Sequence, residues 1–384
     1  MRALCAALVC CGAVVAQAKP PKRVDLRWQG KAYAADKLPA ELASGARDAW
    51  KQWSAWAHEH GYKLELTGDQ HLLLAYPKQQ SSAASDLTRI DAAAKIFERL
   101  APLPDRATMP GAFPPGLKEA IGEPPSALPE GLSPADFPAC DRATAVLLKA
   151  RTVDDYEAVV RAAVKLGDGL EGWQSDALAH RGFVLPEPLC AAWISTGAPG
   201  MEEWSPEAEL VHRVAQLLLM RRFGPQPWWL TVGLAWNVEM EQIGGVYCFP
   251  YRDGFVGVGE HTGWDKNLAA AFKARKKEAL EASELFGLVR GGFDSASAEI
   301  AWGCVGYLAS QKPGALSLLL ADLRTARLVK GRVELEDGTW TLARDFELPK
   351  DEQLRLLHKR AGNDVRTELS AWFAKGLPGR KPAK

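Results

Sequence analysis

Apolar and polar residues alternate along the chain at spacings that predict both helices and strands. In the first hundred residues, four such segments follow one another: a helix over 36–60, strands over 63–66 and 71–76, and a helix over 85–100. In the first of these helices Trp50, Trp53 and Trp56 lie three residues apart, and residues at that spacing share one helix face. We interpret this stripe as a packing face, with an aromatic platform for sugars as the alternative. Residues 19–100 are therefore predicted to form a small α/β unit.

The stretch 101–139 interrupts this patterning with ten of the chain's 25 prolines. Proline has no amide donor and a fixed φ angle, so a proline-rich helix or strand is unfavourable. We therefore expect a long surface loop or linker between the N-terminal unit and the next folded part of the chain.

Beyond this stretch, the pattern again predicts strands and helices. The apolar runs 143–148 and 191–194 predict buried strands, with a helix between them. Ser205, Pro206 and Glu207 form a strong helix start. The hydroxyl can cap the first turn, proline fits there, and the acid favours the positive end of the helix dipole.

The helix that begins after Ser205 should end before Gly224, and a second helix should begin near Trp228, after two prolines. Further along, 314–376 is predicted to form a hairpin and closing helices. The last residues, 377–384, are predicted to be a flexible tail.

Composition and charge narrow the class of protein. Hydrophobic residues make up 47% and charged residues 24%, which is typical of a globular protein. Lys and Arg number 47 and so do Asp and Glu, which gives a formal net charge of zero. A neutral chain offers no electrostatic case for binding nucleic acid or an anionic membrane.

The first 18 residues have the pattern of a signal peptide. A short positive start is followed by the uncharged apolar run 3–15 and by the small residues Ala16 and Ala18, which flank Gln17. We predict cleavage between Ala18 and Lys19, and hence a secreted or periplasmic protein. No later run is long enough to predict a membrane span.

Export to an oxidising compartment would allow the cysteines to form disulfides. The predicted mature chain keeps Cys140, Cys190, Cys248 and Cys304, an even number for an oxidising compartment. Two disulfides are expected, with Cys140–Cys190 and Cys248–Cys304 as the preferred pairing. The alternative is four buried free thiols. The spacings contain no Cys-x-x-Cys, so they do not favour a cysteine zinc site.

The predicted helix pair resembles the core of gluzincin-type zinc metallopeptidases, in particular the bacterial peptidase-MA-like group. The chain reads Glu-Leu-Val-His-Arg-Val-Ala-Gln-Leu-Leu at 209–218 and Pro-Trp-Trp-Leu-Thr-Val-Gly-Leu-Ala at 227–235. The family carries His-Glu-x-x-His on one helix and Pro-x-Trp-Leu-x-Glu-Gly-Leu-Ala on the next. The resemblance implies an α+β fold in which a small sheet packs on an active-site helix pair over 140–313, with an N-terminal α/β unit and a helical C-terminal part.

Mapped onto the family motif, the packing positions remain but the chemical groups do not. His212 holds the position of the first zinc ligand, Arg213 that of the general base, Gln216 that of the second histidine and Val232 that of the third ligand. The retained packing positions are Gly224, Pro227, Trp229, Leu230, Gly233, Leu234 and Ala235.

The residue types at the mapped positions argue against zinc. Zinc needs three or four nitrogen, oxygen or sulfur ligands, whereas Val232 offers none and Arg213 adds a fixed positive charge. Glu239 lies seven residues beyond Val232, about 10.5 Å along the helix, which is too far for the same metal. No cofactor is therefore predicted, and His212 is expected to be a hydrogen-bonded histidine.

The sequence thus predicts an exported, non-catalytic pseudopeptidase. It would bind a peptide, a cell-wall fragment or a protein partner in the inherited cleft, with Trp228, Trp229 and Glu239 as candidate lining residues. The alternative is an active hydrolase that uses carboxylates at another site, with carbohydrate as the suggested substrate. The sequence gives no indication of the oligomeric state.

Overall fold

The computed structural model describes most of the 384-residue chain. The described residues are 21–102, 143–167, 170–180, 182–196, 205–249, 260–275, 278–286, 293–334, 336, 340–343 and 346–379. The predicted signal peptide, nearly all of the proline-rich stretch, Cys140 and the last residues of the predicted tail lie outside them.

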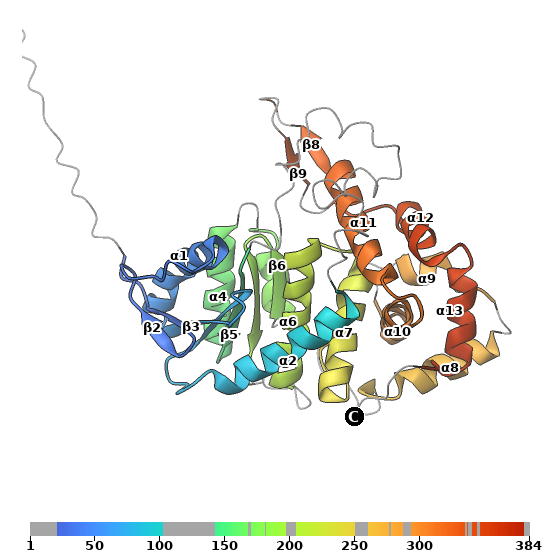
Figure 1. Cartoon of the computed structure of the whole chain (residues 1–384), viewed down its shortest axis with the longest axis horizontal. Helices are drawn as coiled ribbons and strands as arrows, with labels where there is room; N and C mark the ends of the chain where they lie inside the picture. Colours follow the sequence, from blue (N-terminus) through green and yellow to red (C-terminus); the bar gives the residue numbers. More distant parts are fainter. Residues whose placement is uncertain are drawn as a thin grey trace, which may run out of the picture.

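Seven strands form one mixed sheet (Figure 1). From one edge to the other they are β2 (Lys31–Tyr33), β1 (Leu26–Trp28), β3 (Tyr62–Leu66), β4 (Leu72–Pro77), β5 (Ala145–Ala150), β7 (Leu189–Ile194) and β6 (Gly182–Pro186). Three neighbouring pairs, β1–β3, β4–β5 and β5–β7, are parallel, and the other three are antiparallel. Through the pairing of β4 with β5, strands from both sides of the proline-rich stretch share one layer.

The central strand β4 is apolar throughout because both faces of the sheet are covered there. On β4, alternate side chains enter different cores: Leu72, Leu74 and Tyr76 lie in one, and Leu73 and Ala75 in the other. Successive side chains of a strand point to opposite faces, so a strand covered on both sides needs no polar alternation. This explains the continuous apolar run of this strand.

Helices cover the two faces unequally. One face carries α1 (Ser44–Glu59), α4 (Val153–Leu166) and α5 (Gln174–His180). The other carries α2 (Ala84–Leu100) and α6 (Pro206–Phe223), with α7 (Trp228–Ile243) packed against α6. Trp50 and Trp53 of α1 are buried in the first core, so the predicted packing role of these two residues is confirmed.

The rest of the chain is mainly helical and gathers beyond α7, away from the sheet (Figure 1). Its elements are α8 (Trp264–Ala274), α9 (Ala282–Phe286), α10 (Ser295–Gln311), α11 (Ala315–Lys330), β8 (Arg332–Glu334), β9 (Trp340–Leu342), α12 (Lys350–Ala361) and α13 (Val365–Ala374). A Cβ at Gly233 of α7 would lie 2.7 Å from the carbonyl oxygen of Ala301, so glycine permits the close crossing of α7 and α10. The predicted α+β class is confirmed. Among the described residues, no helix combines the length and apolar character that crossing a bilayer requires.

Helix α6 begins and ends at the residues from which its ends were predicted. The Ser205 side chain accepts a hydrogen bond from the amide of Ala208 at 3.2 Å, and Pro206 begins the helix. Gly224 ends it with a φ of 68°, a left-handed value that glycine adopts without strain. Local sequence therefore sets where this helix begins and ends.

The three described cysteines are buried free thiols, so the predicted Cys248–Cys304 bond is not formed. Cys190 lies on β7 in the core beneath α4, whereas Cys304 lies on α10 in the other core. The Cys248 thiol faces Glu209 of α6. Cys190 is also free, and its predicted partner Cys140 lies outside the described residues. Cys190 and Cys304 are held apart by the two different cores into which they pack.

Candidate functional site

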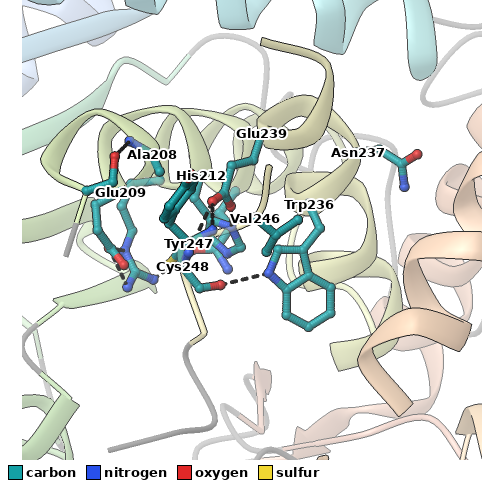
Figure 2. Close-up of polar contacts among 12 residues, drawn as sticks. Ala208, Glu209, His212, Trp236, Asn237, Glu239, Val246, Tyr247 and Cys248 are labelled. Atoms are coloured by element: carbon teal, nitrogen blue, oxygen red, sulfur yellow. Dashed lines mark hydrogen bonds and ion pairs between the residues drawn. The ribbon is translucent and has the colours of Figure 1, made fainter. Parts of the chain in front are cut away.

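Helices α6 and α7 bring His212 and Glu239 together in the interior. The Nδ1 atom of His212 lies 3.1 Å from Oε2 of Glu239, and both side chains are fully buried (Figure 2). Sequence analysis placed Glu239 only as a cleft-lining residue and missed this pairing. The available signal was a carboxylate within the apolar face of α7, because a buried carboxylate requires a hydrogen-bonding partner.

Glu239 also anchors the segment that follows α7. Its Oε1 accepts hydrogen bonds from the backbone amides of Tyr247 and Cys248, the latter at 3.1 Å. The indole Nε1 of Trp236 donates to the carbonyl oxygen of Cys248 at 2.7 Å (Figure 2). Both carboxylate oxygens are therefore in use, and the chain at 246–248 is held against α7.

Arg213 lies in a second buried network on α6. Its Nε donates to Oε2 of Glu209 at 3.2 Å, and its Nη1 donates to Oε1 of Gln216 at 3.0 Å. Residues three and four apart share a helix face, so this network follows directly from the sequence spacing. The Arg213 and Glu209 side chains are only 5% and 4% exposed, so the ion pair is screened little by water.

The Arg213 guanidinium also packs against the edge strand β6. A Cβ built at Gly182 would lie 2.7 Å from Nη2 of Arg213 and 3.4 Å from the carbonyl oxygen of Ala192. Only a residue without a side chain leaves room for the guanidinium there. Arg213 thus fills the space between α6 and β6.

Burial dominates the electrostatics of the His212–Glu239 pair. Desolvation, together with the positive charge of Arg213, lowers the pKa of His212 well below its usual value. Desolvation raises the pKa of Glu239 well above its usual value, although two backbone amides oppose the shift. Both directions favour an uncharged pair, with one proton in the hydrogen bond between Nδ1 and Oε2.

Two other groups in this region also have shifted pKa values. Burial opposes the charge of Arg213, but neighbouring groups, the Glu209 carboxylate foremost, together outweigh burial and raise the pKa of the guanidinium. Burial, with a contribution from Glu209, raises the pKa of the Cys248 thiol well above its usual value. Arg213 therefore stays charged, and Cys248 stays a protonated, unreactive thiol.

The residues at the mapped metal positions do not fit a zinc ion. Nε2 of His212 and Nε2 of Gln216 are buried and have no hydrogen-bond partner among the described residues. His212 could offer one ligand, but the oxygen of Gln216 is taken by Arg213 and Val232 has no donor atom. Within the described part of the chain, no group of three His, Cys, Asp or Glu side chains is placed to hold a metal.

The structure does not bring the two predicted tryptophans to this cluster. Trp228 and Trp229 lie on the first turn of α7, eleven and ten residues from Glu239, or about 15–16 Å along the axis. Trp229 is 2% exposed, and its indole donates to Oε1 of Gln353 at 3.1 Å. Trp228 is only partly buried and makes an edge contact with the ring of Phe293.

Comparison with protein-family models, with curated proteins and with solved structures gave no match to this chain.

Proposed function

We propose that the protein is an exported, non-catalytic relative of the gluzincin metallopeptidases. The observation that carries this proposal is the buried Arg213–Glu209 ion pair beside Gly182, because it fills the space that a catalytic base and its water would need. A gluzincin-like origin is further supported by the motif-like packing residues of α6 and α7.

Chemistry of the zinc-peptidase type would fail at this place for two reasons. A guanidinium cannot act as a general base near neutral pH, because it does not release its proton. A catalytic zinc also needs three protein ligands and an open coordination position. One unpartnered histidine nitrogen, a neutral amide and a valine do not supply them.

We propose that the ligand is an extended peptide or an extended segment of a protein partner, with a cell-wall peptide as one source. Strand β6 pairs only with β7 among the described strands, so its other edge offers backbone donors and acceptors. Open sheet edges bind extended chains by adding a strand, which uses main-chain hydrogen bonds. The apolar residues of β6 and the filled space beside it suit binding without turnover.

The zinc content of the purified mature protein tests the first part of the proposal. We expect less than stoichiometric zinc and no peptide cleavage that a chelator abolishes. Stoichiometric zinc in the wild-type protein would contradict the proposal.

A restoration experiment tests the inherited geometry. The variant Arg213→Glu, Gln216→His and Val232→Glu supplies two histidines, a third ligand and a base. Glu209→Gln is added, because Glu209 would otherwise repel the new carboxylate at position 213. We expect this variant to gain zinc affinity, measured as a zinc-dependent rise in Tm. The matched control adds His212→Ala and should gain none. A folded variant whose Tm ignores zinc would reject the gluzincin geometry.

Hydrogen exchange tests strand addition. A degenerate mixture of short peptides should slow exchange of the β6 amides at 182–185, while those of β2 (Lys31–Tyr33), at the opposite edge of the same sheet, should be unaffected. Equal protection of both edges, or of neither, would contradict a specific site at β6.

A further inference from the structure

Trp173 differs from the other half-buried tryptophans in the described part of the chain. Those others are Trp56 and Trp228. Their indole nitrogens are buried, whereas the indole nitrogen of Trp173 is open to solvent and bonds to no described residue. Tryptophan combines a large apolar ring with one hydrogen-bond donor, and a ring that keeps both accessible is typical of a binding surface.

Trp173 lies beside the edge strand β6. It directly precedes α5, and its ring makes an edge contact with the ring of Phe183 on β6, with centroids 4.8 Å apart. The Phe183 ring also contacts Tyr156 of α4, with centroids 6.0 Å apart, and Phe183 is only 3% exposed. Helix α4 packs on the inner strands β5 and β7, whereas α5 packs on β6. Trp173 therefore covers Phe183 from the outer part of the sheet.

A strand that adds to β6 would bring one side chain next to these two rings. Neighbouring strands lie about 4.7–4.9 Å apart, and directly opposite residues have Cβ atoms about 4.5–5.5 Å apart on the same face. The side chain opposite Phe183 would thus lie on the face that α5 covers, within reach of the Trp173 ring. A large apolar side chain would bury the exposed part of that ring, whereas a small polar one would leave it in water.

We propose that Trp173 selects the segment that adds to β6: the residue opposite Phe183 carries a large apolar side chain, such as that of leucine, which packs on the indole. This inference rests on the proposed strand addition, and it names the class of side chain that the site prefers. The main-chain hydrogen bonds of an edge strand hold any extended chain, so they supply affinity without sequence preference. Trp173 supplies the preference, as side-chain pockets do in other proteins that bind by strand addition.

Two blocked peptides test the proposal on the full mature chain. One is acetyl-Thr-Thr-Leu-Thr-Thr-amide, and the other has serine in place of the leucine. We expect the leucine peptide to bind about tenfold more tightly, because only its central side chain leaves water against the ring. With ¹⁵N-labelled tryptophan, the indole signal of Trp173 should shift in a saturable way with the leucine peptide. The signal of Trp50, which is buried in α1, should not respond.

A pair of tryptophan variants isolates the indole. Trp173→Ala should remove most of the preference for leucine over serine, while both peptides still slow hydrogen exchange of the β6 amides. The matched control is Trp228→Ala, because Trp228 is also half-buried but lies on the first turn of α7. That variant should keep the preference. If Trp173→Ala does not fold, the two peptides and the indole shift in the wild-type protein decide alone.

The outcomes separate this inference from the proposed function. Protection of the β6 amides with equal affinities for the two peptides would overturn the role of Trp173 and leave strand addition standing. An unchanged preference in Trp173→Ala, or an indole signal of Trp173 that does not shift, would do the same. If neither peptide protects the β6 amides, both the strand addition and the role of Trp173 are overturned.

Discussion

The two ends of α7 differ in how their side chains pack. Near the end of the helix, Glu239 uses both carboxylate oxygens, one toward His212 and one toward two backbone amides. At the first turn, Trp228 and Trp229 border a small hollow of about 50 Å³, which Phe286, Leu323 and Phe346 also line. The charged groups near the end of α7 are thus enclosed and paired with neighbouring groups, whereas the mainly apolar first turn borders unfilled space.

Under the proposed gluzincin origin, the packing residues of the motif are kept, while His212, Arg213 and Gln216 make structural contacts. A buried ion pair contributes little net stability compared with apolar residues of the same size. Removing only one partner, however, destabilises the protein strongly, because the other charge stays buried without a partner. The stability of the protein should therefore fall when either Arg213 or Glu209 is replaced alone, and fall less when both are replaced together. The region around the hollow should respond to the loss of apolar surface instead.

The largest effect is expected from breaking the ion pair of α6. Arg213→Met leaves Glu209 buried without its partner and should lower the free energy of unfolding by about 3–5 kcal/mol. The double variant Arg213→Met, Glu209→Gln removes both charges and should recover most of that loss. Urea denaturation of the three proteins measures both numbers. A single variant as stable as the wild type would mean that the pair is not buried in solution.

The tryptophans of the first turn of α7 should differ from each other. Trp229→Ala removes a buried indole that also donates to Gln353, so a loss of about 3–5 kcal/mol is expected. Trp228 is only partly buried, and Trp228→Ala should cost roughly half as much, in proportion to the smaller buried area. Denaturant unfolding of each variant gives the comparison. Equal effects would place both rings in the same environment and contradict the geometry of this turn.

A smaller effect is expected where Arg213 contacts β6. Gly182→Ala places a methyl group 2.7 Å from Nη2 of Arg213, and such overpacking costs about 1–3 kcal/mol. The cost should fall in the background of Arg213→Met, Glu209→Gln, because the more flexible methionine can move aside. A double-mutant cycle measures this coupling. Strict additivity would show that the guanidinium does not press on the strand.

The pH dependence of stability tests the uncharged state of the His212–Glu239 pair. The depressed pKa of His212 gives stability that is present above about pH 6.5, the unfolded pKa, and is lost as the pH falls. The raised pKa of Glu239 gives stability that is present below its unfolded value of about pH 4.5 and is lost as the pH rises. Between these values the two slopes have opposite signs, so the stability from the pair should vary least with pH between about 4.5 and 6.5.

Glu239→Gln separates the two contributions, since glutamine imitates the protonated carboxyl group. Above pH 6.5 the wild-type protein should lose up to about 1.4 kcal/mol per pH unit through Glu239, and the variant should not. Urea denaturation at pH 6.5, 7.25 and 8.0 gives the difference between the two proteins, in which the other titrating groups cancel. Parallel curves for wild type and variant would show that Glu239 is ionised in the folded protein.

The sequence by itself determined the local features of this protein. The start of α6 at Ser205 and its end at Gly224 follow from capping and backbone freedom, which act over a few residues. The common face of Glu209, Arg213 and Gln216 follows from the helix period alone. The replacement of a base and of two ligands, which the resemblance to the gluzincins implies, likewise rests on positions along the sequence alone.

Only the tertiary structure decided which groups meet across elements. His212 and Glu239 are 27 residues apart on different helices, and Arg213 reaches Gly182 only because α6 packs beneath β6. Tertiary structure also decided that β4 pairs with β5 across the proline-rich stretch and that the three described thiols stay unbonded. Such pairings depend on how whole faces of helices and sheets pack together. Spacing along the chain does not encode that arrangement, because it constrains only neighbours within one element.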